Sequence, residues 1–263
     1  MNRLAIDGGK KVFPMPPAIP AWPPVYPETA ETLKEIYLSR RWSFYGEREL
    51  QFNEQFAAFT DSQYSVMMAN GTVTLECALK VLGVGPGDEV IVPAHTWIAT
   101  GEAVVYCGAT PVIVDIEPDT LCLDPAKFEA AITPRTKAVI PVHLFGSLAD
   151  MDKIMDIARK HGIRVLEDCA HAHGGRWNGR HVGSIGDIGS FSFQQTKLLP
   201  SGEGGCCTTN DEEFAVALGR LSHIGYPHGA RQGEKGTPPP VGMICHNYRV
   251  TEFQAAILLA ELE

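Results

Sequence analysis

From residue 64 onward, short apolar runs that suit β-strands alternate with segments of helical periodicity. The runs are almost continuously apolar, which is typical of strands buried on both faces of a parallel sheet. This alternation predicts an α/β fold with a mostly parallel seven-stranded sheet and helices on both faces. The predicted strands are residues 64–68, 89–93, 110–115, 137–142, 163–168, 188–193 and 205–209.

Helices are expected between these strands and at both ends of the sheet. Asp150 and Asp211 are the expected N-caps of two of them, and Gly162 is an expected stop. A last helix opens at Thr251 with the capping-box pattern T-x-x-Q and reaches Glu263 without a stop signal, which predicts that the natural chain continues. The other predicted helices are residues 28–40, 47–60, 72–82, 96–107, 125–132, 150–161 and 211–223.

The sequence divides into three expected regions. Residues 1–27 include a proline-rich stretch and are expected to form an extended N-terminal arm. Residues 28–246 are expected to form the large, ligand-binding domain, which ends in a Gly- and Pro-rich loop at 226–242. Residues 247–263 are expected to start the connection to a C-terminal domain that is missing here.

Composition narrows the class of protein. The 22 basic and 31 acidic residues give a net charge of −9, which argues against nucleic acid or an anionic membrane as a partner. No apolar stretch has the length of about 18 residues that a membrane span needs, and the N-terminus lacks the apolar core of a signal peptide. Seven cysteines without a C-x-x-C pair suit a reducing compartment, so a cytoplasmic location is predicted.

Two residues carry the strongest chemical signal. Lys197 lies in FSFQQTKLLPSGEGG, between a short aromatic strand and a glycine-rich turn, and Asp168 ends the strand IRVLED. Taken alone, a lysine is usually a surface charge and a carboxylate after a strand usually caps a loop. In a parallel sheet, however, ligands bind beyond the carboxyl ends of the strands. The pair therefore predicts a Schiff-base lysine and a carboxylate that pairs with the pyridinium nitrogen of pyridoxal phosphate.

Three further signals are weaker. The turn Asn70-Gly71-Thr72 opens a helix and could bind a phosphate, although most helix starts bind nothing. Ser192 could add a hydroxyl to the same phosphate. Trp97 follows a strand end, where an aromatic ring stacks on a flat ligand about as often as it fills the core.

A metal site and a dinucleotide site are both disfavoured. Asp168, His171 and His173 lie close together in sequence, but no further cluster of ligands is near them, and no metal is predicted. His171 could instead bond the phenolic oxygen of the cofactor ring, and His173 is expected to be structural. The glycine runs at 83–87 and 202–205 lie on the wrong side of their helices and strands for a nicotinamide fingerprint.

Taken in order, these segments resemble the DegT-type (DegT/StrS) sugar aminotransferases, which use pyridoxal 5′-phosphate. The resemblance covers most of residues 28–263 and is carried by NGTVTLECALKVLG, LEDCAHAHGG, GSFSFQQTKLLPSGEGG and NYRVTEFQAAIL. It implies the large domain of the aspartate-aminotransferase-like (type I) fold. Details such as RRWSFYG, DTLCLDP and KLLPSGEGG look most similar to the branch that acts on carbocyclic ketones, which includes glutamine:scyllo-inosose aminotransferases and aminohydroxybenzoate synthases.

The resemblance also implies roles for individual residues. Lys197 matches the lysine of the internal aldimine, Asp168 the partner of the pyridine nitrogen, and Trp97 the aromatic residue stacked on the ring. The residues that match phosphate contacts are Gly71, Thr72 and Ser192.

The resemblance implies a contact with a neighbouring subunit at Asn247 and a departure from many relatives at His171. Asn247 matches an asparagine that reaches the phosphate of the neighbouring subunit, which implies a homodimer with shared active sites. Many relatives carry glutamine where His171 stands, so this contact differs in kind from theirs.

The expected reaction moves an amino group from an amino acid, L-glutamine or L-glutamate, to a keto-cyclitol or a nucleotide-linked keto-sugar. Sugar dehydratases of the family have histidine in place of the lysine, so Lys197 argues against dehydration. Aromatising synthases keep the lysine and remain an alternative. A catalytically inactive α/β binding module is the other alternative, because the missing C-terminal domain would remove part of the substrate pocket.

Overall fold

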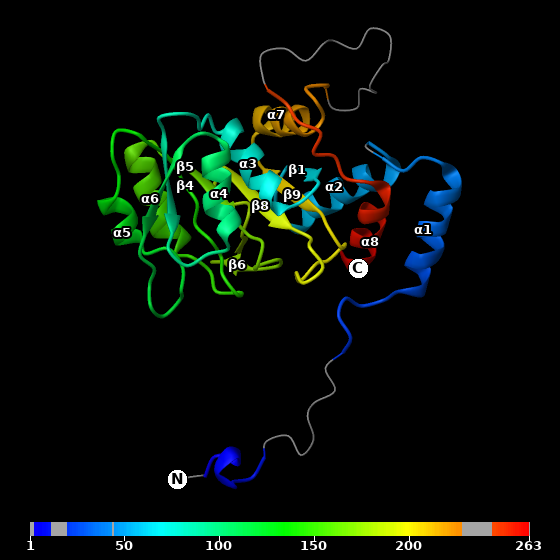
Figure 1. Ribbon diagram of the computed structural model, residues 1–263, viewed down its shortest axis with the longest axis horizontal. Helices are drawn as coiled ribbons and strands as arrows, with labels where there is room; N and C mark the ends of the chain where they lie inside the picture. Colours follow the sequence, from blue (N-terminus) through cyan, green and yellow to red (C-terminus); the bar gives the residue numbers. More distant parts are fainter. Residues whose placement is uncertain (1–2, 12–19, 44, 228–243, 263) are drawn as a thin grey trace.

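The computed structural model describes residues 3–11, 20–43, 45–227 and 244–262, and its centre is a seven-stranded sheet of order β1-β9-β8-β5-β4-β2-β3 (Figure 1). Neighbouring strands run parallel from β8 across to β3, whereas β9 is antiparallel to both β8 and β1. The predicted mostly parallel α/β sheet is confirmed. The strands are β1 (Tyr64–Met68), β2 (Glu89–Pro93), β3 (Thr110–Val114), β4 (Thr136–Val139), β5 (Arg164–Asp168), β8 (Ile188–Ser192) and β9 (Gly205–Thr209).

The largest difference from the predicted strands is in β4, which ends at Val139 instead of residue 142. Proline has no N–H for a strand ladder, and Pro141 interrupts the pairing. The chain still follows β5, because Val142 forms an isolated parallel bridge with Asp168.

All eight predicted helices are present, with their ends moved by no more than about two residues. The Asp150 and Asp211 carboxylates accept hydrogen bonds from the first turns of α6 and α7, as expected for N-caps. The helices are α1 (Pro27–Ser39), α2 (Glu47–Phe59), α3 (Gly71–Val81), α4 (Ile98–Tyr106), α5 (Pro125–Ala130), α6 (Met151–His161), α7 (Glu212–Ser222) and α8 (Glu252–Leu262). A 3₁₀ turn, η1 (Ala5–Asp7), precedes them.

A small hairpin of β6 (Arg176–Trp177) and β7 (Arg180–His181) was not predicted. Its turn is Asn178-Gly179, and both residues have positive φ, at 48° and 83°. Asn-Gly is the strongest short signal for a two-residue hairpin turn, so the sequence did contain the information.

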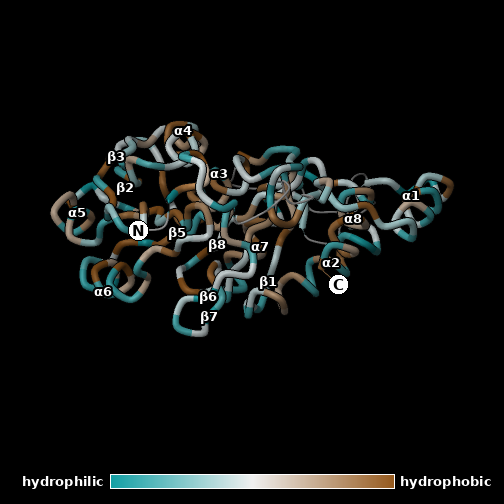
Figure 2. The backbone as a smooth tube through the Cα atoms, turned by 90° about the horizontal axis from the view of Figure 1, so that it is seen from below, coloured by the Kyte–Doolittle hydropathy of each residue, from teal (hydrophilic) through white to brown (hydrophobic). Residues whose placement is uncertain are grey.

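Successive residues of the inner strands pack into two separate cores, one on each face of the sheet. Val165 and Cys206 pack with the helices α2, α5, α6 and α8, whereas their neighbours Leu166 and Cys207 pack with α3, α4 and α7. Figure 2 shows apolar backbone through the interior and polar backbone along many of the outer turns. Two apolar faces are what a sheet covered by helices on both sides requires.

Helix α8 packs against α2 and α1 at one end of the sheet (Figure 1). At its N-terminus one half of the predicted capping box is formed: Gln254 Oε1 accepts from the Thr251 backbone N–H at 2.9 Å, and the Thr251 hydroxyl donates to the same oxygen at 2.6 Å. Most of the proline-rich stretch and of the loop 226–242 lies outside the described residues, and the division of the chain at residue 246 stays a prediction.

Trp22, in the described part of the N-terminal arm, contacts the body of the protein. Its indole N–H donates to the Gln195 carbonyl at 3.1 Å, so the arm is attached to the loop that carries Lys197.

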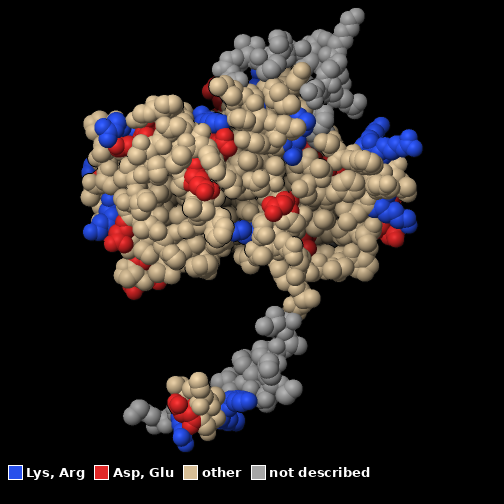
Figure 3. Space-filling view, in the orientation of Figure 1, with Lys and Arg blue, Asp and Glu red and all other residues tan. Residues whose placement is uncertain are grey.

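On the face shown in Figure 3, charged side chains of both signs are scattered over the middle as well as the two ends. Among the described residues, no helix combines the length and the apolar character needed to cross a membrane.

Candidate active site

A cavity of about 840 Å³ opens where the carboxyl ends of β5 and β8 meet the first turns of α3 and α4. It lies on the α3 and α4 side of the sheet. Seven of the eight predicted site residues line it: Gly71, Thr72, Trp97, Asp168, His171, Ser192 and Lys197. Residues that are far apart in the chain, from 71 to 197, therefore surround one space of the size typical for a small-molecule site.

Asp168 is held rigidly at the end of β5. Its backbone N–H donates to the Pro141 carbonyl at 2.9 Å, and its carbonyl accepts from the His143 N–H at 3.0 Å. The side chain is 6% exposed, and Oδ2 accepts a hydrogen bond from the Thr100 hydroxyl at 2.8 Å. Oδ1 accepts from the Ala170 N–H at 3.2 Å. The cavity thus has a buried carboxylate of fixed orientation.

Lys197 lies in the loop between β8 and β9. The loop is closed by backbone bonds that extend the two strands, from the Phe193 N–H to the Gly204 carbonyl at 2.8 Å and from the Gln195 N–H to the Gly202 carbonyl at 2.9 Å. The lysine is partly buried. Burial lowers its pKa below the usual lysine value, and the Asp168 carboxylate opposes that shift. A larger share of the amine is therefore neutral and nucleophilic than in a solvated lysine.

His171 presents an unsatisfied polar atom. Its Nδ1 is buried and has no hydrogen-bond partner among the described residues, although the residue lines the cavity. Burial, and next the positive charge of Lys197, lower the pKa of His171, which favours the neutral ring. Its ring stacks on Phe145 with centroids 5.5 Å apart. A buried nitrogen without a partner beside a cavity indicates a ligand that supplies one.

The Asn70-Gly71-Thr72 turn packs directly against the end of β8. A Cβ on Gly71 would lie 2.6 Å from the Cβ of Ser192, so only glycine permits this approach. The Asn70 side chain accepts from the N–H groups of Thr72 and Val73, both at 3.1 Å. A phosphate at this helix start would share these donors with Asn70 or replace its cap.

Trp97, Asn247 and His173 have distinct surroundings. Trp97 is the residue before the first turn of α4 and is 70% exposed at the cavity, which excludes the core-filling alternative. Asn247 is exposed and lies outside the cavity, in an isolated bridge with His223. His173 is half-buried near the rings of Phe191 and Phe193, both its ring nitrogens are shielded from solvent without a hydrogen-bond partner among the described residues, and burial lowers its pKa to about 3.

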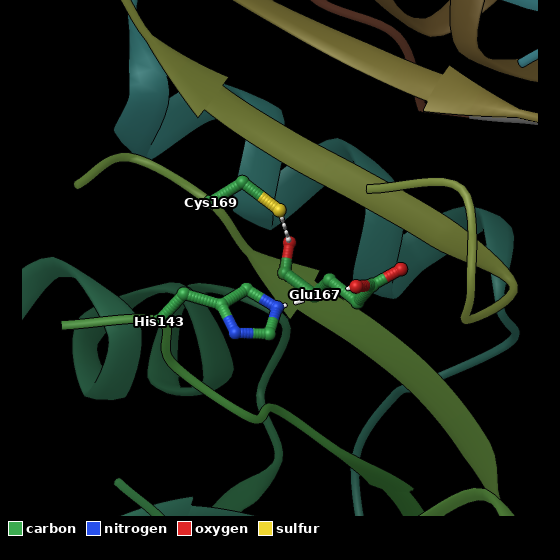
Figure 4. A group of neighbouring side chains, drawn as sticks. All are labelled: His143, Glu167 and Cys169. Carbon is green, nitrogen blue, oxygen red and sulfur yellow. Dashed lines mark hydrogen bonds and ion pairs between the residues drawn. The ribbon is translucent and has the colours of Figure 1, made fainter. Parts of the chain in front are cut away.

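A buried cluster of His143, Glu167 and Cys169 lies next to the Asp168 strand end (Figure 4). The ligand atoms lie within 4.8 Å of one another, but hydrogen bonds already use them. His143 Nδ1 accepts from the Ala149 N–H, which leaves its proton on Nε2, 3.2 Å from Glu167 Oε2. The other Glu167 oxygen accepts the N–H groups of residues 185 and 186 at 2.8 and 2.7 Å. These hydrogen bonds account for the buried charge without a cation.

Sequence reasoning missed several residues that line the cavity, above all Thr100 and Phe145. Thr100 is one helical turn after Trp97, so the spacing W-x-x-T could have indicated that both face the same side. Phe145 lies beyond the carboxyl end of a strand next to β5, where the rule for parallel sheets places ligands.

Comparison with known proteins identifies the family. The DegT/DnrJ/EryC1/StrS aminotransferase family matches residues 25–263, and the chain belongs to this family. It is 42% identical over 268 residues to the L-glutamine:2-deoxy-scyllo-inosose aminotransferase of Streptoalloteichus tenebrarius, a match that covers 98% of this chain and 63% of that protein. It is 47% identical over 214 residues to GDP-perosamine synthase of Caulobacter vibrioides, covering 81% of this chain and 56% of that protein.

The fold has close structural counterparts. The crystal structure of 3-amino-5-hydroxybenzoic acid synthase matches with a TM-score of 0.86 and 39% sequence identity, over 94% of this chain and 63% of that one. The expected large-domain fold is thereby confirmed. The chain spans less than two thirds of the length of these relatives.

Proteins of this family depend on pyridoxal 5′-phosphate, and the cavity fits that cofactor. It combines a buried carboxylate for a ring nitrogen, a lysine of lowered pKa for an aldehyde and an unpartnered His171 nitrogen for a ring oxygen. The close contact of Gly71 and Ser192 at a helix start suits the phosphate. The role of each residue stays a prediction.

The Glu167 hydrogen bonds predict a pH-dependent contribution to stability. Burial raises the pKa of this carboxyl, but hydrogen bonds, first that of His143, outweigh burial and hold its pKa below the usual 4.5. A carboxyl whose pKa is lower in the folded than in the unfolded state stabilises the protein when the pH is above the unfolded-state pKa. This stabilisation is lost as the pH falls through the folded-state pKa. We expect Glu167→Gln to lower the free energy of unfolding by about 2 kcal/mol at pH 7, because the amide would face the His143 proton with a second donor.

Urea unfolding at pH 7 and at a series of values below 4.5 would measure this difference, which should shrink as the pH falls. Glu54→Gln, a change at an exposed carboxylate, is the control and should alter the free energy by no more than about 0.5 kcal/mol. A difference that stayed constant over the whole pH series would contradict the expected role of the Glu167 charge.

Proposed function

We propose that this member of the family is an aminotransferase that moves an amino group from an amino acid, L-glutamine or L-glutamate, to a keto-cyclitol or nucleotide-linked keto-sugar. The observation that carries the proposal is that a partly buried lysine of lowered pKa and a fixed, buried carboxylate line the same cavity. The position of the cavity beyond the carboxyl ends of parallel strands supports it further.

The chemistry divides between the cofactor and the chain. When bound, pyridoxal phosphate supplies an aldehyde carbon and an electron-accepting ring. Lys197 would hold the aldehyde carbon until an amino donor arrives, and its freed amine would then move the proton of the substrate α-carbon. Asp168 would hold a proton at the ring nitrogen.

The remaining residues would bind and orient. The hydroxyls of Thr72 and Ser192 and the backbone at Gly71 would hold the phosphate. Trp97 would cover one face of the ring, which explains why so large an apolar side chain is 70% exposed here. His171 Nδ1 would bond the phenolic ring oxygen.

The substrate class rests on the relatives. One relative is named for glutamine and 2-deoxy-scyllo-inosose, and another for GDP-perosamine. Both names describe polyhydroxylated six-membered rings, one free and one nucleotide-linked, so both acceptor classes are part of the proposal.

An aromatising synthase is the second candidate, because the fold and 39% of the sequence match 3-amino-5-hydroxybenzoic acid synthase. Lys197 suits both reactions. A catalytically inactive binding module is less well supported, because Lys197, Asp168 and the Asn70-Gly71-Thr72 turn are all present at one cavity.

We further propose a homodimer with shared active sites. Large apolar side chains are exposed beside the cavity, including Trp97 at 70%, Phe145 at 72% and Leu198 at 60%. Exposed apolar groups gathered in this way favour a partner surface. Asn247 is exposed and outside its own cavity, as expected of a residue that serves the partner's site.

A cytoplasmic location belongs to the same proposal. Six of the seven cysteines, all except Cys245, are thiols outside any disulfide that are buried as small apolar side chains. Such cysteines suit a reducing compartment.

The Lys197 assignment predicts a single reactive amine. Incubation with pyridoxal phosphate followed by borohydride reduction should label Lys197 at near-neutral pH, because burial lowers its pKa. Peptide mapping by mass spectrometry would locate the label. Lys197→Ala should lose it, whereas Lys153→Ala, which removes an exposed lysine paired with Asp150, should keep it. Equal labelling of the Lys197→Ala protein would refute the assignment.

The reaction class predicts the products. With L-glutamine and a keto-cyclitol, the protein should form an aminocyclitol and one α-keto acid per amino group moved, with ping-pong kinetics. Mass spectrometry of both products would measure this. An aromatic product with loss of water would instead favour the aromatising synthase, and binding of cofactor without any turnover would favour the inactive module.

The shared-site dimer predicts complementation. Lys197→Ala and Asn247→Ala should each be inactive alone, but co-expression should restore about a quarter of wild-type activity, since half of randomly paired dimers contain one intact site. Sedimentation would report the dimer in parallel. If activity failed to return in a mixed dimer, Asn247 would act within its own subunit.

A further inference from the structure

We infer that Thr100 is a positioning residue for the cofactor: with Thr96 behind it, the Thr100 hydroxyl orients the Asp168 carboxylate toward the ring nitrogen. This inference rests on the proposed function, since it assigns Asp168 to the cofactor ring. It adds a residue that acts on the cofactor through another side chain.

The contacts form a short chain of hydroxyl groups. Thr100 is fully buried, and its Oγ1 lies 2.8 Å from Asp168 Oδ2. Thr96 Oγ1 lies 2.8 Å from Thr100 Oγ1, and Thr96 is half-buried at the cavity wall. An ionised carboxylate only accepts hydrogen bonds, so Thr100 donates to Asp168. The Thr100 oxygen is then free to accept the proton of Thr96.

The bonding partner of the Thr100 hydroxyl indicates that this group orients a distant side chain and does not bond the backbone of its own helix. A threonine inside a helix commonly bonds a backbone carbonyl one turn earlier. The Thr100 hydroxyl instead bonds a side chain 68 positions away in the sequence. With the Ala170 N–H on Oδ1, each oxygen of Asp168 accepts one bond from a fixed donor. A carboxylate has about four acceptor positions, so two remain for a ligand in the cavity.

The first turn of α4 also carries Trp97. The Thr100 backbone N–H donates to the Trp97 carbonyl at 3.1 Å, so one turn of backbone fixes both residues. The backbones that carry the indole expected on the ring face and the hydroxyl that orients the carboxylate are therefore directly connected.

Thr100→Val tests the inference, because valine keeps the shape of threonine and removes the hydroxyl. Titration of the purified protein with pyridoxal 5′-phosphate, followed by absorbance, should show roughly tenfold weaker binding, the size expected for a hydrogen bond to a charged group. The pH midpoint of the bound cofactor's absorption band should also shift, by about one unit. Thr100→Ser, a separate variant that keeps the hydroxyl, should have a cofactor affinity and a pH midpoint near the wild-type values.

A double-mutant cycle separates positioning from packing. In an Asp168→Asn background, Thr100→Val should have little further effect on cofactor affinity, because its target charge is absent. An undiminished effect there, or wild-type affinity and pH midpoint in Thr100→Val alone, would overturn the inference and leave the proposed function intact. A wild-type protein that binds no pyridoxal phosphate would overturn the proposed function and this inference with it.

Discussion

The site depends on the parallel pairing of β5 with its neighbours on both sides. Pairing at the level of Val142 and Ser190 fixes the backbone of Asp168, and the side-chain alternation of a strand does the rest. Glu167 points into one core and pairs with His143, whereas Asp168 points to the other face and the cavity. A register slip of one residue would turn Glu167 toward the cavity and Asp168 toward the opposite core. The hydrogen bonds of buried Glu167 oppose such a slip, so they also specify the position of Asp168.

Much of this arrangement follows from local sequence. Strand and helix positions came from apolar periodicity, and the N-caps at Asp150 and Asp211 came from residue type. Lys197 and Asp168 could be placed at one site because Asp168 ends one predicted strand and Lys197 follows another, both at the carboxyl edge of a parallel sheet. Each of these features can be predicted from the residues of one short segment, without knowing which distant segments it contacts.

What could not be predicted depends on contacts between distant segments. No pattern near Thr100 indicates that its hydroxyl meets Asp168, since the contact arises only when α4 packs above the end of β5. The exposure of Trp97 is similar: sequence left stacking and core filling equally open, and only the packed structure excludes core filling. The end of β4 was predicted too late because apolar character outweighed the missing N–H of Pro141.

The bond from the Trp22 indole to the Gln195 carbonyl has a practical meaning for anyone who engineers this molecule. It anchors Trp22 two positions along the chain from Lys197. An affinity handle or fusion partner joined at that end would be connected to the Lys197 loop through residues 1–21. Its linker should be chosen with the entrance for small molecules in mind, not merely for convenience in cloning.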